Sequence, residues 1–80
     1  MKINQRFRTR RDLRFHIVYF EMEGPLETSE VSAKTIEQLS EDRTEDELLK
    51  FVRDNYPDAD AQAEVTEVLD TLKQLSLLSL

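Results

Sequence analysis

Cysteine is absent from this sequence of 80 residues, and histidine and glycine each occur once. Without cysteine the chain forms no disulfide and offers neither a thiolate nucleophile nor an iron–sulfur ligand. A single glycine excludes the common glycine-rich loops that cradle phosphates, because those loops need more than one. We therefore expect no cofactor, and a fold that is stabilised by apolar packing or by a partner.

The single histidine and the many carboxylates do not suggest catalysis. His16 has no second histidine or cysteine with which to share a metal, so we interpret it as a packed or surface side chain. Acidic residues cluster where turns and helix starts are expected, and capping and solvation account for them. A general acid and base need a walled cleft, and so short a chain buries only about 60–65% of its unfolded surface. We expect no metal site, no catalytic residue and no enzymatic activity.

Long apolar runs are also missing. No stretch approaches the roughly 20 residues that span a bilayer, and residues 1–6 lack the apolar core of a secretory signal. We therefore expect one cytoplasmic domain over residues 1–80, with no membrane partner.

Charge is divided unevenly along the chain. Residues 1–14 carry six basic side chains and one acidic one, a net charge of +5. Residues 15–80 carry five basic and sixteen acidic side chains, a net charge of −11. This acidic body argues against nucleic acid as the main partner, because neutralised phosphates supply most of that affinity. The simplest interpretation of the N-terminal arginines is a solvated edge strand that its charges protect from aggregation.

In the N-terminal third, a period of two predicts a small antiparallel sheet. Alternation predicts strands over residues 3–10 and 13–20. Residues 15–20 are largely apolar on both faces, which is typical of a central strand. A short third strand over residues 26–28 must lie at an edge, because Pro25 cannot donate to a ladder.

The remaining residues have a helical period and predict three helices. Ser29 or Ser32 can cap the first helix. Thr44 and Glu47 form a capping box for the second helix, which Pro57 ends. The third helix has the most regular apolar stripe, formed by Ala61, Val65, Val68, Leu72 and Leu75, with Leu69 beside it.

These patterns predict an α+β fold of the winged helix-turn-helix type. A three-stranded antiparallel sheet (residues 1–28) is followed by a three-helix part (residues 29–80). The edge strand at residues 25–28 can accept a further strand through main-chain hydrogen bonds. The chain also has more apolar residues than one helix stripe needs, which favours a binding surface. The surplus consists of Val18, Phe20, Leu69, Leu77, Leu78 and Leu80.

The C-terminal half carries motifs at helix-packing positions. They are residues 35–39 (TIEQL), 43–49 (RTEDELL), 56–57 (YP) and 64–75 (EVTEVLDTLKQL). In these motifs the chain resembles the leader-peptide recognition domains, or RiPP recognition elements, of pathways that modify ribosomally made peptides. It is similar to the small peptide chaperone of pyrroloquinoline quinone biosynthesis. It departs from the family pattern at Asp42, Glu64, Val68 and Ser76, where glycine, aspartate, an aromatic residue and glycine are usual.

The resemblance implies a winged helix-turn-helix domain that binds the leader peptide of a precursor as an added β-strand. The leader then lies beside the third strand and against the third helix. The implied peptide-binding residues are Pro25, Leu26, Glu27, Thr28, Thr66, Leu69, Leu72 and Lys73. The implied partners are the precursor leader peptide and a separate or fused modifying enzyme, such as a radical SAM enzyme, a cyclodehydratase or a peptidase.

Two alternatives stay open at this point. A winged helix-turn-helix DNA-binding regulator would use the N-terminal arginines. Its recognition helix would present Glu64, Glu67 and Asp70 to phosphates that repel them. A structural domain would instead dock, or form a homodimer, through the leucine-rich end at residues 76–80.

Overall fold

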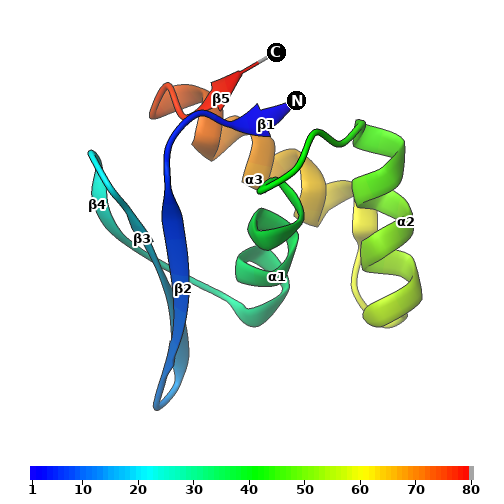
Figure 1. Ribbon diagram of the computed structural model, residues 1–80. Coiled ribbons are helices and arrows are strands. Elements are labelled where there is room, and N and C mark those ends of the chain that lie inside the picture. The colour runs from blue at the N-terminus through cyan, green and yellow to red at the C-terminus, as the bar shows by residue number, and fades with distance from the viewer. Residues whose placement is uncertain (80) are drawn as a thin grey trace.

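A computed structural model describes residues 1–79 and places a three-stranded sheet on one side and three helices on the other (Figure 1). Leu80 lies outside the described residues. The strands are β1 (Lys2–Ile3), β2 (Phe7–Asp12), β3 (Phe15–Phe20), β4 (Gly24–Thr28) and β5 (Leu78–Ser79). The helices are α1 (Glu30–Gln38), α2 (Glu45–Asn55) and α3 (Ala61–Gln74). The predicted α+β fold, an antiparallel sheet of three strands followed by three helices, is confirmed.

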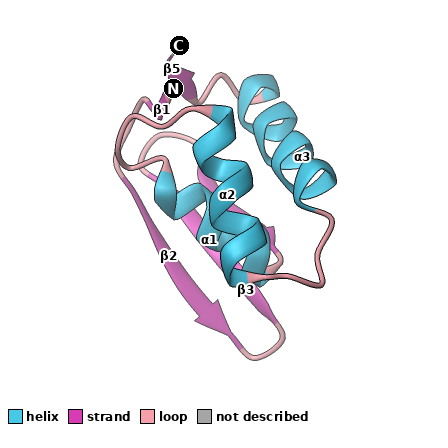
Figure 2. Cartoon of the chain, turned by 90° about the vertical axis from the view of Figure 1, so that its right-hand side faces the viewer, coloured by secondary structure: helices cyan, strands magenta, loops and turns pink. Residues whose placement is uncertain are grey.

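β3 is the central strand of the larger sheet, whose order is β2-β3-β4 with antiparallel neighbours. Successive side chains of β3 point to opposite faces, and the helices cover only one of these faces (Figure 2). Val18 and Phe20 face the helices and are 0% and 3% exposed. Ile17 and Tyr19 lie on the other face and are partly exposed. The sheet therefore contributes one face to the core, as antiparallel sheets commonly do.

Each helix begins at a side-chain cap. Ser29 and Asp60 each accept a backbone N–H from the first turn that follows. Both hydrogen bonds of the predicted capping box between Thr44 and Glu47 are present. These caps satisfy N–H groups that the first turn leaves without helical partners. No helix within residues 1–79 is long and apolar enough to cross a membrane.

One apolar cluster joins the inner face of the sheet to all three helices. The predicted stripe of α3 forms its centre, since Val65 and Leu72 are fully buried. The other large apolar side chains that are fully buried are Val18, Ile36, Leu39, Leu48, Val52 and Leu77. The core thus draws on every element from β3 to the end of α3, and also on the segment after α3.

β1 and β5 form a second, two-stranded sheet. Ile3 is opposite Leu78, its side chain is buried, and its N–H donates to the carbonyl of Leu39 at 2.9 Å. Asn4 continues the connection by donating its N–H to Leu77 O at 2.9 Å. The prediction of one strand over residues 3–10 is therefore wrong. The chain bends after Ile3 because that side chain is buried at the helical end of the molecule.

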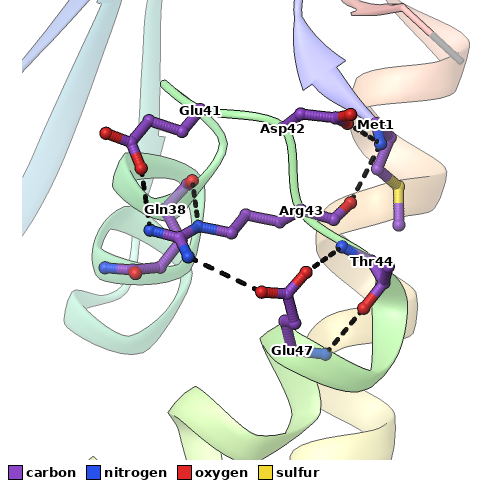
Figure 3. Close-up of polar contacts among 7 residues, drawn as sticks. All are labelled: Met1, Gln38, Glu41, Asp42, Arg43, Thr44 and Glu47. Atoms are coloured by element: carbon purple, nitrogen blue, oxygen red, sulfur yellow. Dashed lines mark hydrogen bonds and ion pairs between the residues drawn. The ribbon is translucent and has the colours of Figure 1, made fainter.

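The loop between α1 and α2 holds the N-terminus through a polar network (Figure 3). The Met1 ammonium donates to Asp42 Oδ1 at 2.6 Å and to the carbonyl of Arg43 at 2.9 Å. The Arg43 guanidinium donates to the Gln38 carbonyl at 3.4 Å and lies 3.6 Å from a carboxylate oxygen of Glu47. The network thus connects the end of α1, the start of α2 and the first residue.

α3 ends in a Schellman motif in which Ser76 takes the place that glycine usually occupies. The N–H of Leu77 donates to Leu72 O at 2.8 Å, and the N–H of Ser76 donates to Lys73 O at 3.0 Å. The φ angle of Ser76 is 58°, and within residues 1–79 no other non-glycine residue has a positive φ. This left-handed conformation is strained for an L side chain.

Replacing Ser76 with glycine should raise the free energy of unfolding by about 1 kcal/mol, because glycine adopts a positive φ without steric cost. The melting temperature of a domain of this size should then rise by about 4–8 °C. Ser40→Gly is the matched control, because Ser40 follows α1 without a positive φ and should gain nothing. A melting temperature of Ser76→Gly at or below that of the parent would contradict the strain argument.

The capping box predicts a loss of stability in acid. The Thr44 N–H and the nearby Arg43 charge hold the pKa of Glu47 below its ordinary value. A carboxylate with a lowered pKa contributes stability above its unfolded pKa, and this contribution is lost as pH falls through the folded pKa. In urea titrations between pH 7 and pH 3, roughly the range that brackets carboxylate titration, Glu47→Gln should therefore lose less stability than the parent.

Thr44→Ala provides the contrast for this measurement. It removes the hydroxyl acceptor of the cap, so it should lower the free energy of unfolding by about 1 kcal/mol at pH 7. Much of the acid dependence should remain, because the Thr44 N–H still donates to Glu47. An acid dependence of Glu47→Gln equal to that of the parent would exclude Glu47 as a source of the pH effect.

Candidate binding groove

A small groove lies between β4 and α3, with α1 as its floor. Its volume is about 90 Å³. Its lining residues are Leu26, Glu27 and Thr28 from β4, Ser32 and Ile36 from α1, and Glu67, Val68 and Thr71 from α3. Small-molecule sites are typically larger, at about 300–1,000 Å³. The groove suits one short aliphatic side chain.

The groove has an apolar bottom and a polar rim. Ile36 and Val68 are buried, and Leu26 is half-buried against the same core. Thr28 and Thr71 are partly exposed and bring hydroxyl groups to the sides. Glu67 is exposed and places one negative charge at the rim on the α3 side.

Local structure explains how the walls of the groove are positioned. Gly24 begins β4 with a φ of +89°, a conformation that glycine adopts without strain. Ser29 alone separates β4 from α1, so the strand wall and the helical floor are held together by one residue. The third wall, α3, is placed by the helix-turn-helix connection and by the burial of Val65 and Leu72.

β4 is an edge strand with a pairing partner on one side only. Its register with β3 runs from Thr28 opposite His16 to Gly24 opposite Phe20. Pro25 lies within this ladder opposite Tyr19, and proline is confined to edge strands because it lacks an N–H. The free side of β4 is therefore a main-chain edge that lies beside the groove.

The strand residues of the sequence-predicted site lie together at this edge. Leu26, Glu27 and Thr28 line the groove, and Pro25 precedes them on the same strand with its side chain exposed. Leu26 and Thr28 point to the helical side of the sheet. Alternation turns Pro25 and Glu27 to the opposite face.

The helix residues of the sequence-predicted site are divided among three positions on α3. Leu69 and Leu72 are 5% and 0% exposed and belong to the core. Thr66 lies along the solvent face of α3, in a shallow depression that this helix lines together with Asp60. Lys73 is exposed and lies outside the groove. The helix face that meets the groove is instead the one that carries Glu67, Val68 and Thr71.

Sequence reasoning missed five groove residues: Ser32, Ile36, Glu67, Val68 and Thr71. Glu67 and Thr71 are four residues apart and border Val68, which the sequence placed in the apolar stripe of α3. That spacing marks one flank of the stripe. The sequence alone does not show which flank of the α3 stripe borders the groove, because that depends on where β4 lies.

Four of the six residues of the apolar surplus inferred from the sequence lie in the core, Leu78 is partly buried, and Leu80 lies outside the described residues. Val18, Phe20, Leu69 and Leu77 are all buried, so their number does not indicate a binding surface. Among residues 1–79, the most exposed large apolar side chains are Leu13 and Met22, which are 95% and 83% exposed at the turns that flank β3.

His16 approaches one carboxylate, with Nε2 3.8 Å from Glu30 Oε1. Within residues 1–79, no group of three histidine, aspartate or glutamate side chains is arranged to hold a metal ion.

Comparisons with protein-family models, with curated proteins and with solved structures found no match for the chain. The groove and the free edge of β4 are therefore the features that bear on function.

Proposed function

We propose that the chain is a non-catalytic module that binds the leader peptide of a precursor as a further strand along β4. It would thereby deliver the precursor to a modifying enzyme of a RiPP natural-product pathway, such as a radical SAM enzyme, a cyclodehydratase or a peptidase. The observation that carries this proposal is a free main-chain edge directly beside a groove of one side-chain volume.

The edge and the groove supply the two components of strand addition. Main-chain hydrogen bonds along β4 provide affinity that does not depend on sequence, and a pocket for one alternate side chain provides specificity. The inward side chains of β4, Leu26 and Thr28, already border the groove. A guest strand in register with β4 would direct every second side chain toward α3.

The lining predicts the chemistry of the guest peptide. Ile36, Val68 and Leu26 select an aliphatic side chain for the bottom of the groove. Glu67 at the rim favours a lysine or arginine two positions away, because successive inward side chains of a strand are about 7 Å apart. The preferred peptide is therefore extended, with an aliphatic anchor and a basic neighbour on the same face.

Binding of the leader explains how a protein without catalytic groups can assist a reaction. A leader held on the module keeps the attached core peptide near the enzyme that the module contacts. The second encounter then becomes intramolecular, and its effective concentration depends on the length of the linking segment.

The main alternative, binding of duplex DNA, has one feature in its favour, which is the arginine-rich strand β2 in the wing. The exposed residues of the recognition helix do not fit this function. Glu67 and Asp70 are exposed on α3, and Lys73 is its only basic residue. An acidic helix in the major groove would be repelled by the phosphates.

Short peptides selected from a displayed random library should carry the extended aliphatic and basic pattern. In ¹⁵N-labelled protein, their binding should shift the amides of Leu26, Glu27 and Thr28 together with those of Glu67 and Thr71. Proline at the peptide positions that donate to β4 should abolish the shifts. Shifts confined to β2, or a duplex that binds more tightly than every selected peptide and is displaced by salt, would overturn the proposal.

Thr71→Arg should fill the groove without opening the core and weaken peptide binding by about 10–100-fold, the value of one buried aliphatic side chain. Gln74→Arg is the matched control, because it adds the same charge to an exposed position of the same helix outside the groove. Isothermal titration should separate the two variants. Equal losses in both would attribute the effect to charge and would contradict the groove as the binding site.

A further inference from the structure

The face of the sheet turned away from the helices is not covered by any other element of the fold described for residues 1–79 (Figures 1 and 2). Its central row consists of Phe15, Ile17 and Tyr19 on β3, which alternate with the buried row of that strand. Arg8 and Arg10 on β2 lie opposite Tyr19 and Ile17. An aromatic and aliphatic row is thus bordered on one side by two guanidinium groups.

The two guanidinium groups on this face have no ion-pair partner among the described residues. The side chains of Arg8 and Arg10 are both exposed. The guanidinium carbon of Arg8 lies 5.4 Å from the centre of the Tyr19 ring, which holds that arginine over the apolar row. Glu27 on β4 borders the opposite side. The face is therefore positive where Arg8 and Arg10 lie and apolar along β3. It is negative at Glu27 on β4 and at Asp12, which lies opposite Phe15 at the end of β2.

The dimensions of the face match one helix. Three strands span about 10 Å across, which is the diameter of a helix with its side chains. Strands of six residues are about 20 Å long, which corresponds to about 13 helical residues. A depression of about 370 Å³ opens at the end where β2 begins and is lined by Arg8, Tyr19 and Glu21, among others. It can receive a large side chain at one end of such a helix.

We propose that this face docks one acidic amphipathic helix of a partner protein. Its apolar stripe would cover Phe15, Ile17 and Tyr19, and carboxylates along one side of the stripe would pair with Arg8 and Arg10. Of the residues named on this face, Glu27 also borders the β4 groove, and the others lie outside that groove.

Charge and packing argue against two other occupants. A second copy of the chain has acidic helices, but the apolar stripes of its α2 and α3 are buried in its own core. These helices therefore have no apolar stripe free to cover Phe15, Ile17 and Tyr19. A nucleic acid strand would meet Glu27 on the face and Glu21 and Glu23 at the turn beside it. A nucleic acid strand carries a phosphate at every nucleotide, so some phosphates would lie beside these carboxylates. A short helix can carry carboxylates only where they face Arg8 and Arg10.

The test uses the whole chain and a labelled helical peptide of about 14 residues, with leucines at helical spacing and glutamates along one side of that stripe. Binding should shift the amides and side chains of residues 8–10 and 15–19 and leave Thr71 unaffected. The double variant Arg8→Gln/Arg10→Gln should weaken binding roughly tenfold, as expected for two exposed ion pairs. Arg53→Gln, an exposed arginine on α2, is the matched control and should leave the affinity unchanged.

Two further probes make the result decisive. A peptide with glutamine in place of each glutamate should bind about as weakly to the parent as the glutamate peptide binds to the double variant. Circular dichroism should show that the double variant and Arg53→Gln are both folded, because Arg8, Arg10 and Arg53 are all exposed. Equal affinity of parent and double variant for the glutamate peptide would overturn the proposal. So would tighter binding of single-stranded oligothymidine with shifts on the same residues, which would identify a nucleic acid surface.

Discussion

The packing of the helical layer against one face of a three-stranded sheet is the constraint on which the other features depend, with α1 in contact with β2 and β3 and α2 packed against α1 and α3. Val18 and Phe20 on the central strand can be buried only if α1 and α3 lie over them. The alternate row of the same strand must then point to the opposite face, because the period of a strand is two. β4 has no second neighbour in this sheet, because the chain passes from it into α1 after a single residue. The groove and the uncovered face both result from this arrangement.

A chain with neither a disulfide nor a metal site within its described residues depends on local hydrogen bonds where its apolar core is thin. Side-chain caps begin all three helices, and the network around Arg43 joins two of them to the first residue. At Ser76 a strained conformation is retained by the two hydrogen bonds of the helix end. The side-chain amide of Asn4 donates to the carbonyl of that serine at 2.8 Å, which ties the strained residue to the N-terminal segment.

Much of the fold follows from periodicity, because alternation and helical spacing report burial directly. The row of β3, the capping box at Thr44 and the stripe of α3 were predictable for this reason. The two-residue strands β1 and β5 were not, because so short a segment has no period and its partner lies at the other end of the chain. The helix side of the groove was also missed. Leu69 and Thr71 differ by about 200° around the helix axis, and only the position of β4 decides which of them borders the groove.

The pairing of β1 with β5 has a consequence for the order in which the molecule assembles. It pairs Lys2 with Ser79, the largest sequence separation among the strand pairings of the described residues, so it closes a long loop. Contacts of such large sequence separation contribute little until the intervening chain is already compact. The helices and the β2-β3-β4 hairpins, whose contacts are local, can form before this closure. Residues 1–4 and 76–79 are thus expected to be the last segments to acquire protection from hydrogen exchange during folding, and the first to lose it.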